Sequence, residues 1–262
     1  MRILVSLESD ENLDKLNFKL GRFLSIIEDP EIFIDLLHVY KPPEGHKSEQ
    51  NEAVIEEIKN NEHKMKLKMI AKCENGLETY LQDNLNKRSL VNSYVLEGNY
   101  KERLIKHIVF HRYDLMFLNP GKKREFNLIL RGRITHWVID NLEIPVIIMP
   151  NYLEPDESSP YCITCFVDEL ASYNNIQRSD LFNKFKRSNI KFVHFGRHGF
   201  HDDVEVVNSV NPLESITGFT KCCNRNDVFV LNHKNKGNFL NFLDKSFSKN
   251  VIQSLQNPLL IF

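Results

Sequence analysis

The sequence lacks the features that would direct it to a membrane, to secretion or to nucleic acid. No stretch approaches the roughly 18 consecutive apolar residues that a spanning helix needs, and the apolar run at the start meets charge too early for a signal peptide. The formal net charge is only −1, so no excess of one sign indicates nucleic acid or a membrane surface as a partner. We therefore expect a cytoplasmic protein.

Cysteine is scarce and odd in number, which argues against a secreted disulfide framework. Cys162 and Cys165 form a CxxC, but they fall in a predicted strand, where residues three apart point to opposite faces. We expect structural thiols there rather than a redox pair. The histidines at 194, 198 and 201 have no thiolate or histidine pair at metal-binding spacing, so we interpret them as loop residues and predict no metal site.

The sequence contains an internal repeat. Residues 114–149 align without a gap over residues 227–262, whereas chance would give roughly two identities. The positions that meet the identical residue 113 positions later are Asp114, Leu118, Asn119, Lys123, Phe126, Leu130, Val138, Ile139, Leu142, Pro145 and Ile148. The apolar run "NPLLIF" at residues 257–262 is therefore the counterpart of "IPVIIM", the last strand of a duplicated domain.

Strands and helices alternate within each copy, which indicates a parallel sheet with right-handed helical crossovers. In the first copy the helical segments are expected at 13–27, 49–86 and 101–110, and in the second copy the long second helix is missing. The expected strands are 2–8, 32–40, 90–98, 115–119 and 146–149, then 162–168, 190–195, 203–210, 228–232 and 258–262. A ligand of such a sheet lies beyond the carboxyl ends of the strands, where the strand order reverses.

The predicted fold class is α/β, with two tandem five-stranded, Rossmann-like domains paired through their last strands. Residues 151–160 are rich in proline, acidic residues and serine, as in an exposed linker. The first domain is predicted at 1–150 and the second, shortened one at 161–262.

Several of these segments together resemble the universal stress protein family, whose fold is adenine nucleotide alpha hydrolase-like. They are the strand that ends in an acid, "LLHVYKPPE", the loop of small and basic residues after "DLMFL", Gly132 and "VIDNLEIPVIIM". The resemblance implies a stress-response role, ATP or AMP as a ligand, and an internal pseudo-dimer that can assemble further into a homodimer. Tandem copies are a known arrangement in that family.

Nucleotide-binding members of that family carry an Asp at the end of the first strand and a loop of Gly, two residues, Gly, nine residues, then Gly and Ser or Thr. Glycine lets backbone amides approach phosphate oxygens. In the first copy Glu8 stands in place of the Asp, Asn119 and Lys122 replace two glycines, Gly132 is retained and Arg133 replaces the hydroxyl residue.

The second copy departs at different points. Asp168 and Ser246 match the family pattern, but Asn232, Asn235 and Lys245 replace all three glycines. The resemblance also implies that a nucleotide bound to the first copy would lie over three further positions. These are Val39, Gly98 and Gly121.

The substituted loops can be interpreted in two ways. Side chains at former glycine positions occupy the volume that a phosphate would fill, which weakens or abolishes binding. In the other direction, Asn tolerates the left-handed conformation and basic side chains can pair with phosphates. The basic side chains concerned are Lys122, Lys123, Arg131, Arg133, Lys234, Lys236 and Lys245.

Three functions follow from the sequence. The first is a binding or regulatory module with an unidentified protein partner, in which adenine-nucleotide binding is weak or lost and no cofactor is retained. The alternative is an ATP- or AMP-binding stress protein whose occupancy controls partner binding. An ATP-dependent enzyme of the related pyrophosphatase class is the least supported. It needs a glycine-rich loop directly after the first strand, and "LESDEN" contains no glycine.

Overall fold

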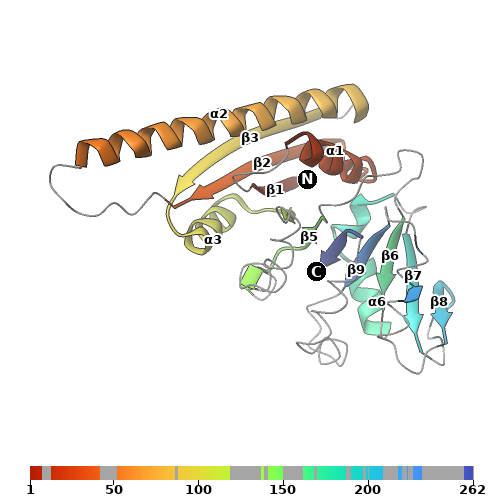
Figure 1. The fold of residues 1–262 in the computed structure, drawn as a ribbon. Coiled ribbons are helices and arrows are strands. Elements are labelled where there is room, and N and C mark those ends of the chain that lie inside the picture. Colours follow the sequence, from red (N-terminus) through yellow and green to blue (C-terminus); the bar gives the residue numbers. More distant parts are fainter. Residues whose placement is uncertain are drawn as a thin grey trace. The chain divides into compact units, whose positions relative to one another are not determined.

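The computed structural model places its described residues in two compact units (Figure 1). Unit 1 comprises Met1–Arg22 and Pro30–Met116, and unit 2 comprises Phe23–Asp29 and Phe117–Phe262. The predicted domain division at 151–160 stays a prediction. The described residues are 1–7, 13–41, 52–85, 88–118, 137–138, 141–149, 162–167, 170–186, 190–196, 199, 201–208, 218–219, 223, 227–231 and 257–261.

The first five strands follow the order β3-β2-β1-β4-β5. Three of them, β1 (Arg2–Leu7), β2 (Glu31–Tyr40) and β3 (Arg88–Glu97), form the parallel sheet of unit 1. Strand β4 (Leu115–Leu118) is buried throughout. The aliphatic runs in β1, β2 and β4 are buried on both faces, as expected for parallel strands covered by helices.

Helices α1 (Leu13–Ser25) and α2 (Glu52–Leu85) lie along one face of the unit 1 sheet, and α3 (Tyr100–His111) lies along the other (Figure 1). The long α2 is mostly polar, and its apolar residues recur at helical spacing. Those that are buried include Ile70, Cys73, Leu77 and Leu81. No helix in the described part of the chain combines the length and the apolar character needed to cross a bilayer.

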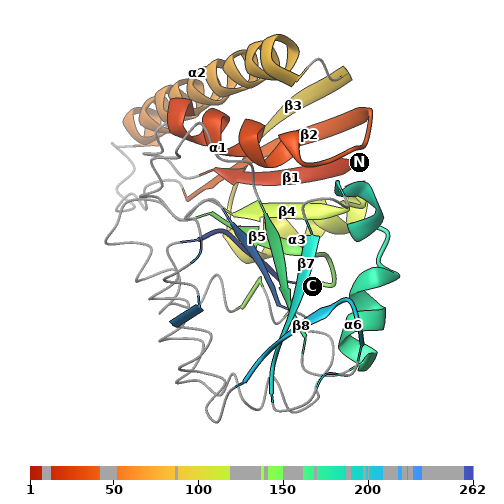
Figure 2. The ribbon, with the colours of Figure 1, turned by 90° about the vertical axis from the view of Figure 1, so that its right-hand side faces the viewer.

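The second five strands repeat the order of the first as β8-β7-β6-β9-β10. Two of them, the paired β7 and β8, are labelled near α6 in Figure 2. All their mutual pairings are parallel. They are β6 (Ile163–Phe166), β7 (Ile190–Phe195), β8 (Val204–Val207), β9 (Val228–Leu231) and β10 (Leu259–Ile261).

The two last strands meet within unit 2. Strand β10 pairs antiparallel with β5 (Val146–Ile148), so that Leu260 lies opposite Ile147. The predicted α/β fold, with two copies of a five-stranded sheet paired through their last strands, is thereby confirmed.

The core of unit 2 includes a segment from the first helix. The Phe23 ring contacts the rings of Phe117 and Phe185, with centroids 6.4 and 6.0 Å apart. Ile27 forms an antiparallel bridge with Phe185, beside the short 3-10 helix η2 (Phe182–Lys184) and after α6 (Leu170–Gln177). Residues 23–29 thus pack with residues that come far later in the sequence.

Two cysteines and one histidine that the structure describes in the second copy bear on expectations drawn from the sequence. Cys165 is buried in β6 and Cys162 is half-buried, and both are free thiols. Burial raises the pKa of Cys165 well above its ordinary value, which suits a structural thiol. The expectation that His194 is a loop residue is wrong, because it lies on β7. Its ring contacts the backbone carbonyl of Val167, which follows β6.

Candidate functional site

The candidate site of unit 1 is the carboxyl end of its parallel strands, where β1, β2 and β3 finish and α3 begins. We call the described polar and glycine residues there the carboxyl-end cluster: Ser6, His38, Tyr40, Gly98 and Tyr100. Because open α/β sheets bind ligands at this end, the state of its hydrogen-bonding groups decides what it can hold.

Gly98 makes the turn that leads from β3 into α3. Its φ is +133°, a conformation that side chains rarely adopt, and its N–H donates to the Tyr40 carbonyl at 3.0 Å. A Cβ atom added here would lie 3.0 Å from Arg103 Nε. The glycine is therefore required by the turn itself, whether or not a ligand lies over it.

The N-terminus of α3 is already capped. The Asn99 side-chain oxygen accepts hydrogen bonds from the Lys101 and Glu102 amides at 3.0 and 3.4 Å. Glu102 also adds a negative charge to the first turn. A helix N-terminus binds phosphate through its free amides and the positive end of its dipole. Here the Asn99 side chain accepts from the amides, and Glu102 lies in the first turn, at the positive end of the dipole.

The end of β1 is closed by a second internal contact. The buried Ser6 hydroxyl lies 2.8 Å from the hydroxyl of Tyr100, the first residue of α3. This hydrogen bond brings the aromatic side chain of Tyr100 to the end of β1. The hydroxyl groups that could have contacted a ribose or a phosphate at this position are thus engaged with each other.

Only two of the predicted site residues lie in the described part of the chain. Val39 is half-buried on β2, next to His38, and Gly98 follows β3. The others lie outside the described residues: Glu8, Asn119, Gly121, Lys122, Gly132, Arg133, Asp168, Asn232 and Ser246. Among the described residues, no group of three or more His, Cys, Asp or Glu side chains could hold a metal ion.

Solved structures with this architecture span the full chain. A universal stress protein from Archaeoglobus fulgidus matches with 14% identity over 99% of this chain and 95% of its own, at a TM-score of 0.63. The chain has the universal stress protein fold. A putative universal stress protein from Pseudomonas aeruginosa matches with 12% identity over 100% of this chain and 92% of its own, at a TM-score of 0.56.

Sequence comparison adds nothing to this structural likeness. No protein family matches the sequence, and no curated protein matches it.

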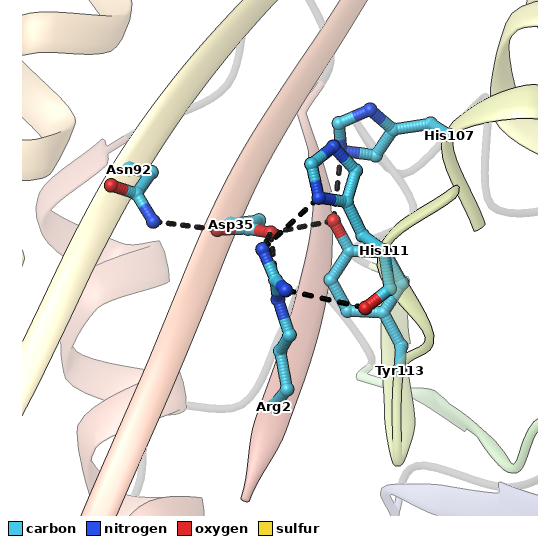
Figure 3. Close-up of polar contacts among 6 residues, drawn as sticks. All are labelled: Arg2, Asp35, Asn92, His107, His111 and Tyr113. Atoms are coloured by element: carbon cyan, nitrogen blue, oxygen red, sulfur yellow. Dashed lines mark hydrogen bonds and ion pairs between the residues drawn. The ribbon is translucent and has the colours of Figure 1, made fainter. Parts of the chain in front are cut away.

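Within this universal stress protein fold, unit 1 also contains a polar cluster on the α3 side of the sheet (Figure 3), in which Asp35, His107 and Tyr113 are buried and the other members are half-buried. We call it the buried network: Arg2, Asp35, Asn92, His107, His111 and Tyr113. Asp35 is fully buried in the middle of β2. Its carboxylate accepts hydrogen bonds from Tyr113 Oη at 2.6 Å, from Arg2 Nε and Nη2 at 3.1 and 2.8 Å, and from Asn92 Nδ2 at 2.9 Å.

The buried network continues onto the C-terminal end of α3. Arg2 donates through Nη1 to the His111 carbonyl and through Nη2 to His111 Nδ1, each at 3.2 Å. Because Tyr113 gives its proton to Asp35, the 2.8 Å contact between Tyr113 Oη and His107 Nε2 must be donated by the histidine. The donors and acceptors are thus directed at one another, and we interpret the network as a structural brace between α3 and the sheet.

The charges in the buried network are stabilised by these contacts. Burial alone would raise the pKa of Asp35, but hydrogen bonds from Tyr113, Asn92 and Arg2 outweigh it and hold that pKa below its ordinary value. Burial and then the Asp35 carboxylate raise the pKa of Tyr113 well above its ordinary value, so it stays a donor at every physiological pH.

Reasoning from the sequence missed the buried network. A signal existed in "IFIDLLHVY", where one acid interrupts an apolar run that must be buried on both faces. A charge in that place requires partners, because an unpaired buried carboxylate is very costly. The sequence could have indicated the need for a cation, but Arg2 lies 33 positions away from Asp35 and Tyr113 lies 78 positions away.

We predict that His107 makes the protein sensitive to mild acid. Burial, and then the nearby His111, lower the pKa of His107 from 6.5 to about 4. The folded protein thus binds this proton less well than the unfolded chain, so the stabilisation is complete above pH 6.5 and is lost as the pH falls to about 4. The free energy of unfolding should fall by about 3 kcal/mol on this account between pH 7 and pH 4, as measured by urea denaturation.

The matched variant for this measurement is His107→Gln, because the Gln amide can still donate to Tyr113 but does not titrate. It should reduce the loss of stability between pH 7 and pH 4, and the control variant His201→Gln, at an exposed position in unit 2, should reduce it less. An unaltered slope in His107→Gln would show that the buried histidine does not cause the acid sensitivity.

Proposed function

We propose that this chain is a binding and regulatory module of the universal stress protein kind, acts in a stress response, and binds adenine nucleotides weakly or not at all. The observation that carries the proposal is that the polar groups at the start of α3 and at the end of β1 already bond one another. Asn99 takes the first amides of α3, and Ser6 and Tyr100 bond each other. A nucleotide entering here would have to break existing hydrogen bonds to form its own, which reduces its net gain.

The sequence of the phosphate loop supports the same conclusion. The resemblance implies close backbone approach to phosphates at three glycine positions. The first copy has Asn119 and Lys122 at two of them, and the second copy has glycine at none of the three. Several amide hydrogen bonds to a charged phosphate, at roughly 1.5 to 3 kcal/mol each, outweigh one neutral side-chain bond near 1 kcal/mol. Loss of backbone approach therefore matters more than loss of one side-chain contact.

One observation favours the alternative, an ATP- or AMP-binding stress protein whose occupancy controls the choice of protein partner. Gly98, at the carboxyl end of β3, is half-buried and has no side chain to exclude a ligand, and Gly132 is retained in the loop of the first copy. Backbone approach to a ligand would thus survive only in the first copy. Any residual nucleotide site is expected there, over Glu8, Val39, Gly98, Gly121 and Gly132.

We expect calorimetry to give a dissociation constant for ATP no tighter than about 100 μM, which is a binding free energy of roughly 5.5 kcal/mol. Residual binding should be lost in Gly132→Asp, because the new side chain occupies the phosphate volume, and should be unchanged in the matched variant Asp168→Ala.

Micromolar binding that disappears in Asp168→Ala and persists in Gly132→Asp would overturn both the weak affinity and the assignment to the first copy. Mass spectrometry of the natively purified protein, before and after denaturation, tests independently of calorimetry whether a nucleotide is bound. A nucleotide released on denaturation would favour the alternative function.

A further inference from the structure

The same histidine contact occurs once in each copy of the fold. His38 Nδ1 lies 3.0 Å from the Leu7 carbonyl oxygen, and His194 Nδ1 lies 3.0 Å from the Val167 carbonyl oxygen. In each case the histidine is on the second strand of its copy and reaches the end of the first strand. Two separately folded segments thus use one residue type and one ring nitrogen for the same contact.

The two contacts are equivalent in register. In β1 and β2, Leu7 pairs with His38. In β6 and β7, Phe166 pairs with Val193, so Val167 comes opposite His194. Strands β1 and β6 are the strands at which the order of their copies reverses, which is the place where open α/β sheets bind ligands.

Chemistry fixes the proton on each ring. A carbonyl oxygen only accepts hydrogen bonds, so Nδ1 must carry the hydrogen and Nε2 is bare in the neutral ring. His38 is 3% exposed, and its Nε2 is buried with no hydrogen-bond partner among the described residues. Burial lowers the pKa of His38, which keeps the ring in this neutral tautomer at neutral pH.

The held carbonyl belongs to the peptide group that leads into the acid of each copy, Glu8 after Leu7 and Asp168 after Val167. A peptide group is planar, so a hydrogen bond to its oxygen also fixes the direction of the following N–H. An apolar residue at position 38 would avoid burying an Nε2 that has no partner among the described residues. The Nδ1 contact is what such a residue could not make, so the ring does more than fill volume.

We propose that His38 and His194 are positioning residues, each of which holds the peptide group before the acid of its copy. This inference rests on the proposed function, because the resemblance implies that the acid after the first strand contacts a ligand. The contact is duplicated although the glycines of the phosphate loop are not. The end of the first strand is thus the part of the ligand site that both copies preserve.

The first test is the tautomer of the two rings in the intact protein, read from long-range ¹H–¹⁵N spectra at pH 7. Both histidines should show a protonated Nδ1 and a bare Nε2. A bare Nδ1 on His38 or on His194 would overturn the proposal for that copy, since the hydrogen bond could not then exist.

The second test compares two replacements of His38. In His38→Phe the ring volume remains but the donor is lost, so the backbone amide signal of Glu8 should shift and exchange with solvent at least five-fold faster. In His38→Asn the side-chain amide takes the place of Nδ1, so the Glu8 signal should stay within two-fold of the wild-type exchange rate. The Asp168 signal should be unaffected in both variants.

If His38→Phe does not fold, His194→Phe and His194→Asn repeat the comparison in unit 2 with Asp168 as the reporter. Two results would show that the ring only fills space. One is a Glu8 amide signal that does not shift in His38→Phe, and the other is an equal exchange rate of that amide in the Asn and Phe variants. Added AMP reports separately on the proposed function. A spectrum unchanged by AMP supports weak or lost binding and leaves the result on positioning as it stands.

Discussion

Replacing Asp35 with alanine is expected to lower the free energy of unfolding by about 3 to 5 kcal/mol, as measured by urea denaturation. The carboxylate is fully buried and accepts from three side chains, so its removal leaves Arg2 without its counter-ion and Tyr113 without its acceptor. Removing one partner of an ion pair leaves the other uncompensated to the extent that it is buried. The Arg2 side chain is 33% exposed, so the buried Tyr113 hydroxyl accounts for much of the loss.

Two variants separate this effect from ordinary loss of an acid. Asp83→Ala, at an exposed position of α2, should change stability by no more than about 0.5 kcal/mol. Asp35→Asn keeps the shape but not the charge, and should cost about 1.5 to 3 kcal/mol, the range for a hydrogen bond to a charged group. If Asp35→Ala were no more costly than Asp83→Ala, the buried network would not brace the fold.

Hydrogen exchange should show which elements lose protection in Asp35→Ala. Arg2 links Asp35 to the last residue of α3, His111. The amides of α3 should therefore exchange faster in Asp35→Ala than in the wild-type protein, while those of β6 and β7 in unit 2 should keep their protection.

Deletion of residues 258–262 is expected to make the protein aggregate. Strand β10 is buried between β5 and β9, with Leu260 fully inaccessible to solvent. Without it, β5 and β9 each present an unpaired apolar edge, which is a template for association with another chain. Light scattering and size-exclusion chromatography at 25 °C would measure the effect. A truncated protein that stayed monomeric, with an unchanged melting temperature, would falsify the role given to β10.

A point variant keeps this prediction testable if the truncated chain does not fold at all. Leu260→Ala removes buried methyl groups from the centre of β10 and should cost about 2 to 5 kcal/mol. The matched control is Val206→Ala on β8. The Val206 side chain is 38% exposed, so this substitution removes less buried apolar surface than Leu260→Ala does. Similar losses at both positions would contradict the central place of β10.

The fold could be predicted because the signals that set it are local and repeated. The gap-free alignment of 114–149 with 227–262 identified the last strand of each copy, and apolar runs located the other strands. The α2 segment was predicted at 49–86 and is observed at Glu52–Leu85. The missing second helix of the second copy is also confirmed, since β7 ends at Phe195 and β8 begins at Val204. Periodicity and repetition are properties of neighbouring residues, so sequence alone reports them.

The contacts at the candidate site could not be predicted in the same way. Neither the capped start of α3 nor the bond between Ser6 and Tyr100 has a periodic signature, because each depends on the residue that the fold brings near. The resemblance concerns the phosphate loop and the acid after the first strand, so it gives no role to His38. His194 and His38 lie outside the aligned segments 114–149 and 227–262, so the repeat does not reveal that they are equivalent.

The inclusion of Phe23–Asp29 in unit 2 has a consequence for the order of events during synthesis. Ile26 and Glu28 bond through their backbone to Lys186 and Lys184, which the ribosome adds about 160 residues later. At roughly 5 to 20 residues per second, that interval is roughly 8 to 30 seconds. For that time the end of the first helix lacks these backbone partners, and Phe23 lacks the Phe185 ring. The core of unit 2 therefore closes only after the second copy has emerged.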